Sequence, residues 1–193
     1  TDGEGWLVRR PLRDLPRALF FIGAFMFLMT LIEGAMSDWA AIYLAERVPG
    51  MAAQAGIAVS IFSAFLAAGR FAGDALKSSI GAIGLARGSA LVGLVGVGCL
   101  VLPLPIAFAY AGFAMVGLGV AAGYPLGVSA VSALDETYQP ANVAIMSTSA
   151  LAGFLVGPPL IGFLGDAIGL QSALAVLAPA LAACLWLSNW LAP

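Results

Sequence analysis

The chain has 193 residues, of which 62% are hydrophobic and only 9% are charged. Soluble domains carry about one quarter charged residues, so this composition excludes a water-soluble protein and indicates an all-α integral membrane protein. The net charge of −2 and the single basic cluster, in the N-terminal arm, argue against nucleic acid as a partner. The absence of histidine argues against the usual zinc sites, and neither a metal nor a cofactor is expected.

The chain contains six apolar runs separated by breaks, and a helix needs roughly 20 apolar residues to cross a bilayer core of about 30 Å. We therefore expect a basic N-terminal arm at 1–15 and a six-helix transmembrane bundle at 16–193. The predicted spans are 16–45, 52–74, 88–102, 106–134, 142–165 and 170–191.

The basic residues predict the orientation, because Lys and Arg in short loops are held on the cytoplasmic side. Arginines precede the first span, and Arg70, Lys77 and Arg87 flank the turn after the second span, on the same side. Only Arg47 lies on the opposite side. Both termini are therefore predicted to be cytoplasmic. A signal peptide is disfavoured, because the basic start continues into a long helix without a small-residue cleavage pattern.

The pattern Phe-x-Gly-Asp-Ala-aliphatic occurs at 71–76 and again at 163–168. The two copies end the second and fifth predicted spans, so one copy faces the cytoplasm and the other faces the outside. Chance is a competing explanation, because Gly and Ala are abundant here. Equivalent placement at helix ends favours two three-helix repeats of inverted orientation, as found within each half of a major facilitator transporter.

Three stretches resemble the major facilitator superfamily. Residues 69–77 resemble the second-half copy of its cytoplasmic loop motif, 153–162 resemble the Gly-Pro segment of its fifth helix, and 33–39 are similar to the seventh helix of bacterial sugar and fucose permeases. The resemblance covers essentially the whole chain. It implies the C-terminal six-helix half, helices seven to twelve, with 1–15 as the linker between halves, in a bacterial cytoplasmic (inner) membrane.

The same resemblance implies a gating loop that contains Gly69, Arg70, Gly73, Asp74 and Lys77. Asp74 ends a helix where the dipole disfavours an acid, so an external partner is expected, namely a helix N-terminus in the other half. The alternative is an exposed Arg70–Asp74 pair, four residues apart, worth a few tenths of a kcal/mol. Gly69 and Gly73 would provide a smooth face for close helix approach.

Two prolines interrupt the fifth predicted span. Pro158 and Pro159, which follow Gly157, remove backbone donors and should kink the helix. Such a kink is either purely architectural or the flexing point of alternating access.

Glu33 interrupts an otherwise apolar first span. It lies sixteen residues past Arg17, about 24 Å along a helix, and is expected beyond the midplane, where no Lys or Arg of this chain is predicted. Its carboxyl must then be protonated, lie in a water-filled cavity, or pair with a group outside the chain. All three indicate a transport pathway. The alternative is a structural carboxylate near the outer interface.

The remaining candidate site residues were chosen by helical spacing. Met26, Thr30 and Ser37 fall on the face of Glu33 at spacings of three and four. Tyr110 and Tyr124 share a face of the fourth span and would form the opposite cavity wall, suited to a small polar solute. Tyrosines are also common as packing or interfacial residues.

The expected function is secondary active transport of a small solute by alternating access, coupled to protons through Glu33, with this chain as one half of the transporter. The expected partners are the solute, the lipid bilayer, and an N-terminal six-helix half or a second copy of the chain. A membrane assembly protein and a homodimeric half-transporter remain open alternatives. An enzyme is disfavoured, because Ser-His chemistry needs histidine and no mid-membrane carboxylate pair is predicted.

Overall fold

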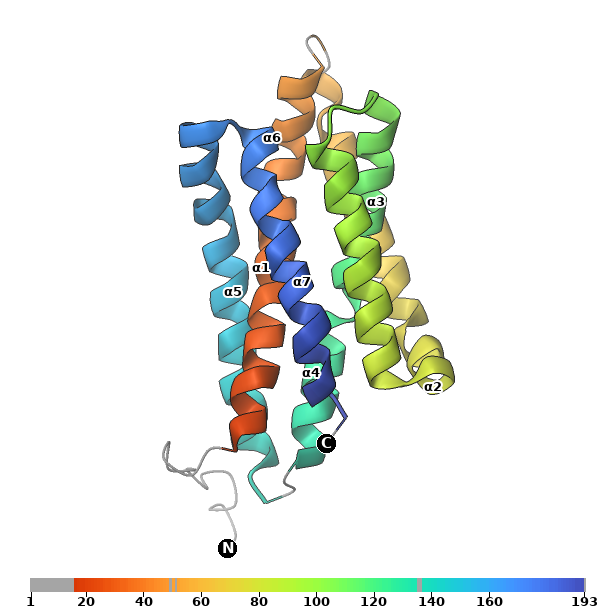
Figure 1. Ribbon diagram of the computed structural model, residues 1–193, viewed down its shortest axis with the longest axis vertical. Helices are drawn as coiled ribbons and strands as arrows, with labels where there is room; N and C mark the ends of the chain where they lie inside the picture. Colours follow the sequence, from red (N-terminus) through yellow and green to blue (C-terminus); the bar gives the residue numbers. More distant parts are fainter. Residues whose placement is uncertain (1–15, 49, 51, 135–136, 193) are drawn as a thin grey trace, which may run out of the picture.

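A computed structural model describes residues 16–48, 50, 52–134 and 137–192, which form a bundle of long helices (Figure 1). The predicted arm at 1–15 lies outside the described residues. The elements are α1 (Arg17–Arg47), η2 (Ala52–Gln54), α2 (Gly56–Val101), α3 (Ile106–Ala121), α4 (Gly123–Leu134), α5 (Gln139–Ile168), α6 (Leu170–Ala173), η3 (Leu174–Val176), α7 (Leu177–Leu187) and η4 (Ser188–Trp190).

Within the described residues, five helical segments are long and apolar enough to cross a membrane. Four of them coincide, to within a few residues, with predicted spans, and the second and third predicted spans fall together in α2. The five segments are Arg17–Arg47, Gly56–Val101, Ile106–Leu134, Gln139–Ile168 and Leu170–Trp190.

Helix α2 is divided at Gly81, whose φ of 75° and ψ of 167° are not helical. Glycine adopts a positive φ without a steric penalty, so the chain can turn at this one residue. A straight 46-residue helix would extend about 69 Å. Instead the chain reverses at Gly81, and two limbs, 56–80 and 82–101, run side by side in opposite directions (Figure 1).

The loop predicted between 74 and 88 is therefore wrong, because helix surrounds Gly81 on both sides. The helix continues through residues 75–80, and a single glycine, Gly81, makes the reversal. The residues of the predicted gating loop consequently lie on the last turns of a helix.

Helix α1 lies in the middle of the bundle and packs closely against α5. Three glycines allow this approach. A Cβ on Gly34 would lie 2.2 Å from the carbonyl oxygen of Phe154, and one on Gly157 would lie 2.2 Å from that of Leu31. Gly153 meets the carbonyl of Phe27 in the same way. In a membrane, burial of apolar surface contributes little to helix association. Close packing of two helix backbones therefore becomes an important source of stability.

Helix α5 is continuous from Gln139 to Ile168, across Pro158 and Pro159. The helix is thus not interrupted at these prolines, and the kink expected there stays a prediction. Proline at 158 leaves the carbonyl of Phe154 without its helical donor, and that carbonyl lies against Gly34. The carbonyl of Pro158 accepts a hydrogen bond of 2.8 Å from Nε1 of Trp39.

A different proline coincides with a break. The predicted span 106–134 is divided at Ala122 into α3 and α4. Pro125 has no N–H to offer the carbonyl of Ala121, so the helical ladder loses a bond at this point. The break places Tyr124 in the first turn of α4, facing α5.

Helix α1 begins, and η4 ends, at the same end of the bundle (Figure 1). The first limb of α2 runs toward that end and α5 runs away from it (Figure 1). Asp74 and Asp166, which are equivalent positions of the repeated pattern, therefore lie toward opposite ends of the bundle.

Candidate functional site

Glu33 of α1 forms an ion pair with Arg70 of the first limb of α2. Nη2 of Arg70 donates to both carboxylate oxygens, at 2.8 and 3.0 Å. The Glu33 side chain is 15% exposed and that of Arg70 is 46% exposed, so the pair lies at the surface of a shallow recess.

The pair lies near the middle of the bundle. Glu33 is fourteen residues before Arg47, the end of α1, and Arg70 is fourteen residues after Gly56, the start of α2. Each distance is about 21 Å along a helix, measured from the same end of the bundle. Both charges therefore lie at one depth, well inside a bilayer core of about 30 Å.

This geometry corrects two predictions. The expectation that no cation of the chain lies at the depth of Glu33 is wrong, because the first limb continues to Ile80 and holds Arg70 well inside the bundle. The alternative Arg70–Asp74 pair is also wrong, because Arg70 is bound to Glu33. Glu33 also lies near the middle of α1 rather than clearly in its outer part.

A cavity of about 220 Å³ opens beside the ion pair. Its walls come from four helices and include three of the residues predicted to bind solute or protons, Thr30, Glu33 and Tyr124. The hydroxyl of Tyr124 lies 3.0 Å from that of Ser147 on α5. The lining is completed by Arg70, Ala150, Leu151 and Phe154.

Thr30 joins the two helices behind this cavity. Its hydroxyl donates to the carbonyl of Ala150 on α5, at 2.7 Å, and lies 2.9 Å from the carbonyl of Met26 on its own helix. Because these bonds already engage the hydroxyl, Thr30 fixes the cavity wall more than it offers a free donor.

Three predicted residues do not line the cavity. Met26 is fully buried and packs against Gly127. Ser37 donates to the backbone carbonyl of Glu33, at 2.8 Å. Tyr110 lies on α3, four residues from its start, partly buried against the core rather than beside Tyr124. The helical spacing that grouped these residues was correct, but their side chains contact the rest of the bundle or the backbone and do not face the cavity.

The predicted gating residues lie on the last three turns of the first limb. Lys77 donates to the hydroxyl of Ser129 on α4. Gly69 packs against α3, since a Cβ there would be 2.6 Å from that of Ala121, whereas a Cβ on Gly73 would meet nothing within 4 Å. Gly69 therefore allows a close helix contact within the chain, whereas Gly73 leaves open space beside the limb, and the predicted smooth face for the other half stays a prediction.

Asp74 is exposed, and within the described part of the chain it has no ion pair or hydrogen bond. It borders a second cavity, of about 140 Å³, together with Arg70 and Lys77. The motif therefore places a carboxylate that has no bonded partner among the described residues beside Arg70 and Lys77, between the middle and one end of the bundle.

One residue of the cavity, Ser147, escaped the sequence analysis, and Arg70 was predicted in a different role. Ser147 sits in an Ala- and Ser-containing run that gives no periodic signal. Arg70 was assigned to the loop motif, although counting residues from Gly56 at the start of the second span would have placed it level with Glu33. Among the described residues, no group of three acidic or cysteine side chains is arranged to hold a metal ion.

No family model matches the chain. It is 32% identical over 174 residues to the membrane protein MosC of Rhizobium meliloti, covering 90% of this chain and 42% of that protein. It is 32% identical over 171 residues to an MFS-type transporter of Yersinia pestis, covering 87% and 44%. A transporter of Sinorhizobium fredii is 34% identical over 175 residues, covering 84% and 46%. The chain thus spans less than half the length of these relatives.

Solved structures of the peptide transporter POT have the same fold. A mutant in complex with alafosfalin matches with a TM-score of 0.81 at 18% identity, over 93% of this chain and 39% of that one. The sulfate complex matches with a TM-score of 0.80, over 95% and 39%. With the relatives, this fold supports an MFS-like membrane transporter, and these relatives include transporters and no enzyme.

Proposed function

We propose that the chain is one six-helix half of a proton-coupled secondary transporter that moves a small solute by alternating access. The Glu33–Arg70 pair carries this proposal. Ionisable groups at mid-membrane are costly and usually mark a functional site. A pair of charges kept beside an open cavity therefore suits a solute or ion pathway better than a purely structural role.

The size of the cavity supports a half-site. Ligand pockets usually enclose about 300–1,000 Å³, whereas this cavity holds about 220 Å³ and is open on one side. A second six-helix bundle would supply the missing wall, either as an N-terminal half or as a second copy of the chain. The greater length of the relatives favours an N-terminal half, the chain itself then being the C-terminal half.

A pair of matching contacts supports two inverted three-helix repeats and six crossings, with α2 counted as two. Gly117 of α3 faces the carbonyl of Phe62, where a Cβ would lie 2.4 Å from the oxygen, as Gly34 faces that of Phe154. Phe62 and Phe154 each lie nine residues before the first residue of the repeated pattern. Helix α1 therefore meets α5 in the same way as α3 meets the first limb of α2. An inverted repeat requires such a match.

The distribution of basic residues supports an orientation with both termini cytoplasmic in a bacterial inner membrane. Arg17, Lys77 and Arg87 lie toward the end where α1 begins, and Arg47 lies at the opposite end. Arg70 is left out of this count of basic residues, because it lies inside the bundle rather than at either end. Positively charged residues are retained on the cytoplasmic side. The end with three of the four basic residues is therefore the cytoplasmic end in this proposal.

The mechanism rests on the exposure of the first limb, in which only Ala58 and Phe62 are buried. Arg70 therefore supplies a main polar contact between this limb and α1. Protonation of Glu33 would neutralise the carboxylate, weaken that contact and free Arg70 for the solute. Near the cytoplasmic end, the unpaired Asp74 would bind the other half when the inner gate closes.

The experiment compares solute exchange with proton-driven accumulation in the full-length transporter reconstituted in liposomes. Glu33→Gln mimics the protonated acid, so exchange should be retained while accumulation is lost. Glu46→Gln, at an exposed carboxylate near the end of α1, is the control and should behave as wild type in both assays. Wild-type behaviour of Glu33→Gln in both assays would return Glu33 to a structural role.

A further inference from the structure

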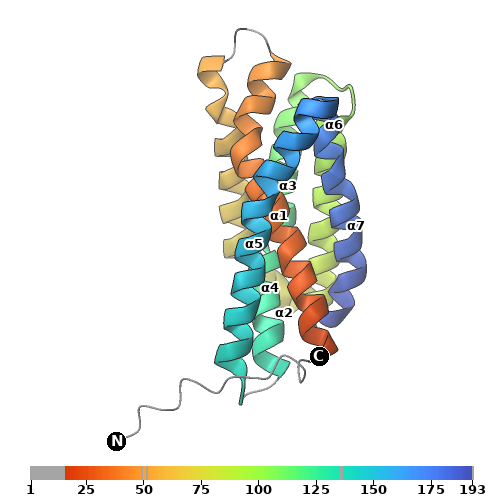
Figure 2. The same cartoon turned by 90° about the vertical axis from the view of Figure 1, so that its left-hand side faces the viewer.

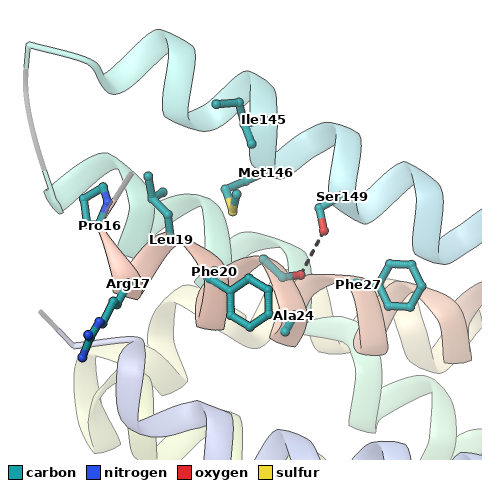
Figure 3. A pocket seen from close by; sticks show the side chains of 10 residues that line it. Pro16, Arg17, Leu19, Phe20, Ala24, Phe27, Ile145, Met146 and Ser149 are labelled. Atoms are coloured by element: carbon teal, nitrogen blue, oxygen red, sulfur yellow. Dashed lines mark hydrogen bonds between the residues drawn. The ribbon is translucent and has the colours of Figure 1, made fainter. Parts of the chain in front are cut away.

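A long groove follows the first half of α1 on a side of the bundle away from Glu33. Helices α5 and α7 diverge toward the end where α1 begins and leave α1 uncovered between them (Figure 2). The groove has a volume of about 640 Å³ and runs from Pro16 and Arg17 to Phe27, with α5 as one wall (Figure 3).

The groove is lined almost entirely by apolar side chains. Phe20, which is 74% exposed, and Ala24 form its floor, and Ile145 and Met146 form its wall (Figure 3). The hydroxyl of Ser149 is already engaged, because it donates to the carbonyl of Gly23, at 3.1 Å. A polar solute would find no free partner along this length.

The end of the groove where α1 begins is different, because the charged side chain of Arg17 lines it. Arg17 is exposed and has no ion pair or hydrogen bond to any other described residue. In the sequence it is the last of four arginines, after Arg9, Arg10 and Arg13. Clusters of four or more basic residues directly beside a membrane helix are typical of binding to anionic lipid.

The length of the groove suits a lipid chain. Ten residues separate Arg17 from Phe27, which is about 15 Å along a helix. One leaflet of a bilayer with a core of about 30 Å is also about 15 Å thick. A headgroup at Arg17 would therefore place an acyl chain along the whole groove.

The groove and the Glu33 cavity use different sides of α5. Ile145 and Ser149 line the groove, whereas Ser147 and Leu151 line the cavity. Residues two apart on a helix point in nearly opposite directions. A second bundle that closes the cavity would leave the groove facing the membrane.

We propose that this groove is a binding site for an anionic phospholipid, with the phosphate on Arg17 and one acyl chain between α1 and α5. The site is independent of the solute pathway and requires only that the protein is in a bilayer. Lipid bound here would hold α1 and α5 together at the end of the bundle where both helices begin.

The test measures binding of spin-labelled phosphatidylglycerol and phosphatidylcholine to the full-length protein in nanodiscs. Wild-type protein should immobilise phosphatidylglycerol preferentially. Arg17→Gln should lower the apparent affinity for phosphatidylglycerol about fivefold and leave phosphatidylcholine unchanged, since one basic residue near an anionic surface has about that effect. Arg87→Gln is the control, because Arg87 bonds to Ser188 and Asn189 and lies away from the groove.

A second variant fills the groove. Ala24→Trp should reduce immobilisation of both lipids, whereas Ala182→Trp, on the exposed side of α7, should not. Equal binding of both lipids by wild type, or equal effects of Arg17→Gln and Arg87→Gln, would overturn the proposal. Exclusion of all labelled lipid from the groove would also overturn it and would assign the groove to a polypeptide segment.

Discussion

Arg70 contacts both carboxylate oxygens of Glu33, at 2.8 and 3.0 Å, and so connects α1 to a limb of α2 that is otherwise weakly buried. The two residues are 37 positions apart in the chain but lie at one depth. Their pairing explains how a carboxylate is tolerated inside an apolar helix. Each of the two charges is therefore stabilised by the other, and removal of one residue leaves the other without its partner.

The first prediction concerns this mutual dependence. Arg70→Gln leaves the Glu33 carboxylate without its cation and should destabilise the protein by at least about 1 kcal/mol, because a buried charged group without a partner is costly. The double variant with Glu33→Gln should recover part of that loss. Thermal unfolding in detergent measures both. Additive losses in the double variant would show that the pair is not coupled.

The second prediction concerns the contact of α1 with α5. Gly34→Ala would bring a Cβ within 2.2 Å of the carbonyl of Phe154, so the helices must separate. The expected loss is about 1–3 kcal/mol, as for other overpacked sites. Gly98→Ala is the matched control, because a Cβ there would meet nothing within 4 Å. Its stability should be unchanged or higher by up to about 1 kcal/mol.

The third prediction concerns Asn142, in the first turn of α5. Its side chain is fully buried, and neither its amide oxygen nor its amide nitrogen has a hydrogen-bond partner among the described residues. A buried polar group without a bond is unfavourable. Asn142→Leu, of similar size, should therefore leave the melting temperature unchanged or raise it. A fall of several degrees would show that the amide does bond in the membrane.

The fourth prediction concerns the inverted repeats. After Cys99 and Cys184 are replaced by Ala, Asp74→Cys should react with a membrane-impermeant thiol reagent from the cytoplasmic side only. Asp166→Cys should react from the opposite side only. The residues lie toward opposite ends of the bundle. Labelling of both from the same side would contradict the arrangement.

The sequence predicted the helical segments well, because apolar runs bounded by turns determine where a chain can cross a membrane. The prediction failed where a single residue determines the direction of the backbone. Gly81 reverses α2 without a loop, so the expected break at 75–87 is almost entirely helix. Pro125 accompanies a break between helices, whereas α5 is continuous across Pro158 and Pro159.

The candidate site was only partly predictable for a related reason. Spacing places residues on one face of their own helix, and it placed Thr30 and Glu33 together correctly. It says nothing about which neighbouring helix covers that face. Met26 is therefore buried by Gly127, and Arg70 reaches Glu33 from a helix that the analysis had ended too early.

The central claim is that the cavity beside the Glu33–Arg70 pair belongs to a solute or ion pathway, which must be open to water. Two matched leucines test it most directly. Leu151 lines the cavity and Leu91 lies on the outside of the second limb of α2. Both are near the middle of their helices and are 59% and 53% exposed. In the cysteine-free, full-length protein, Leu151→Cys should react with an impermeant thiol reagent and Leu91→Cys should not. Equal lack of reaction at both positions would contradict the account.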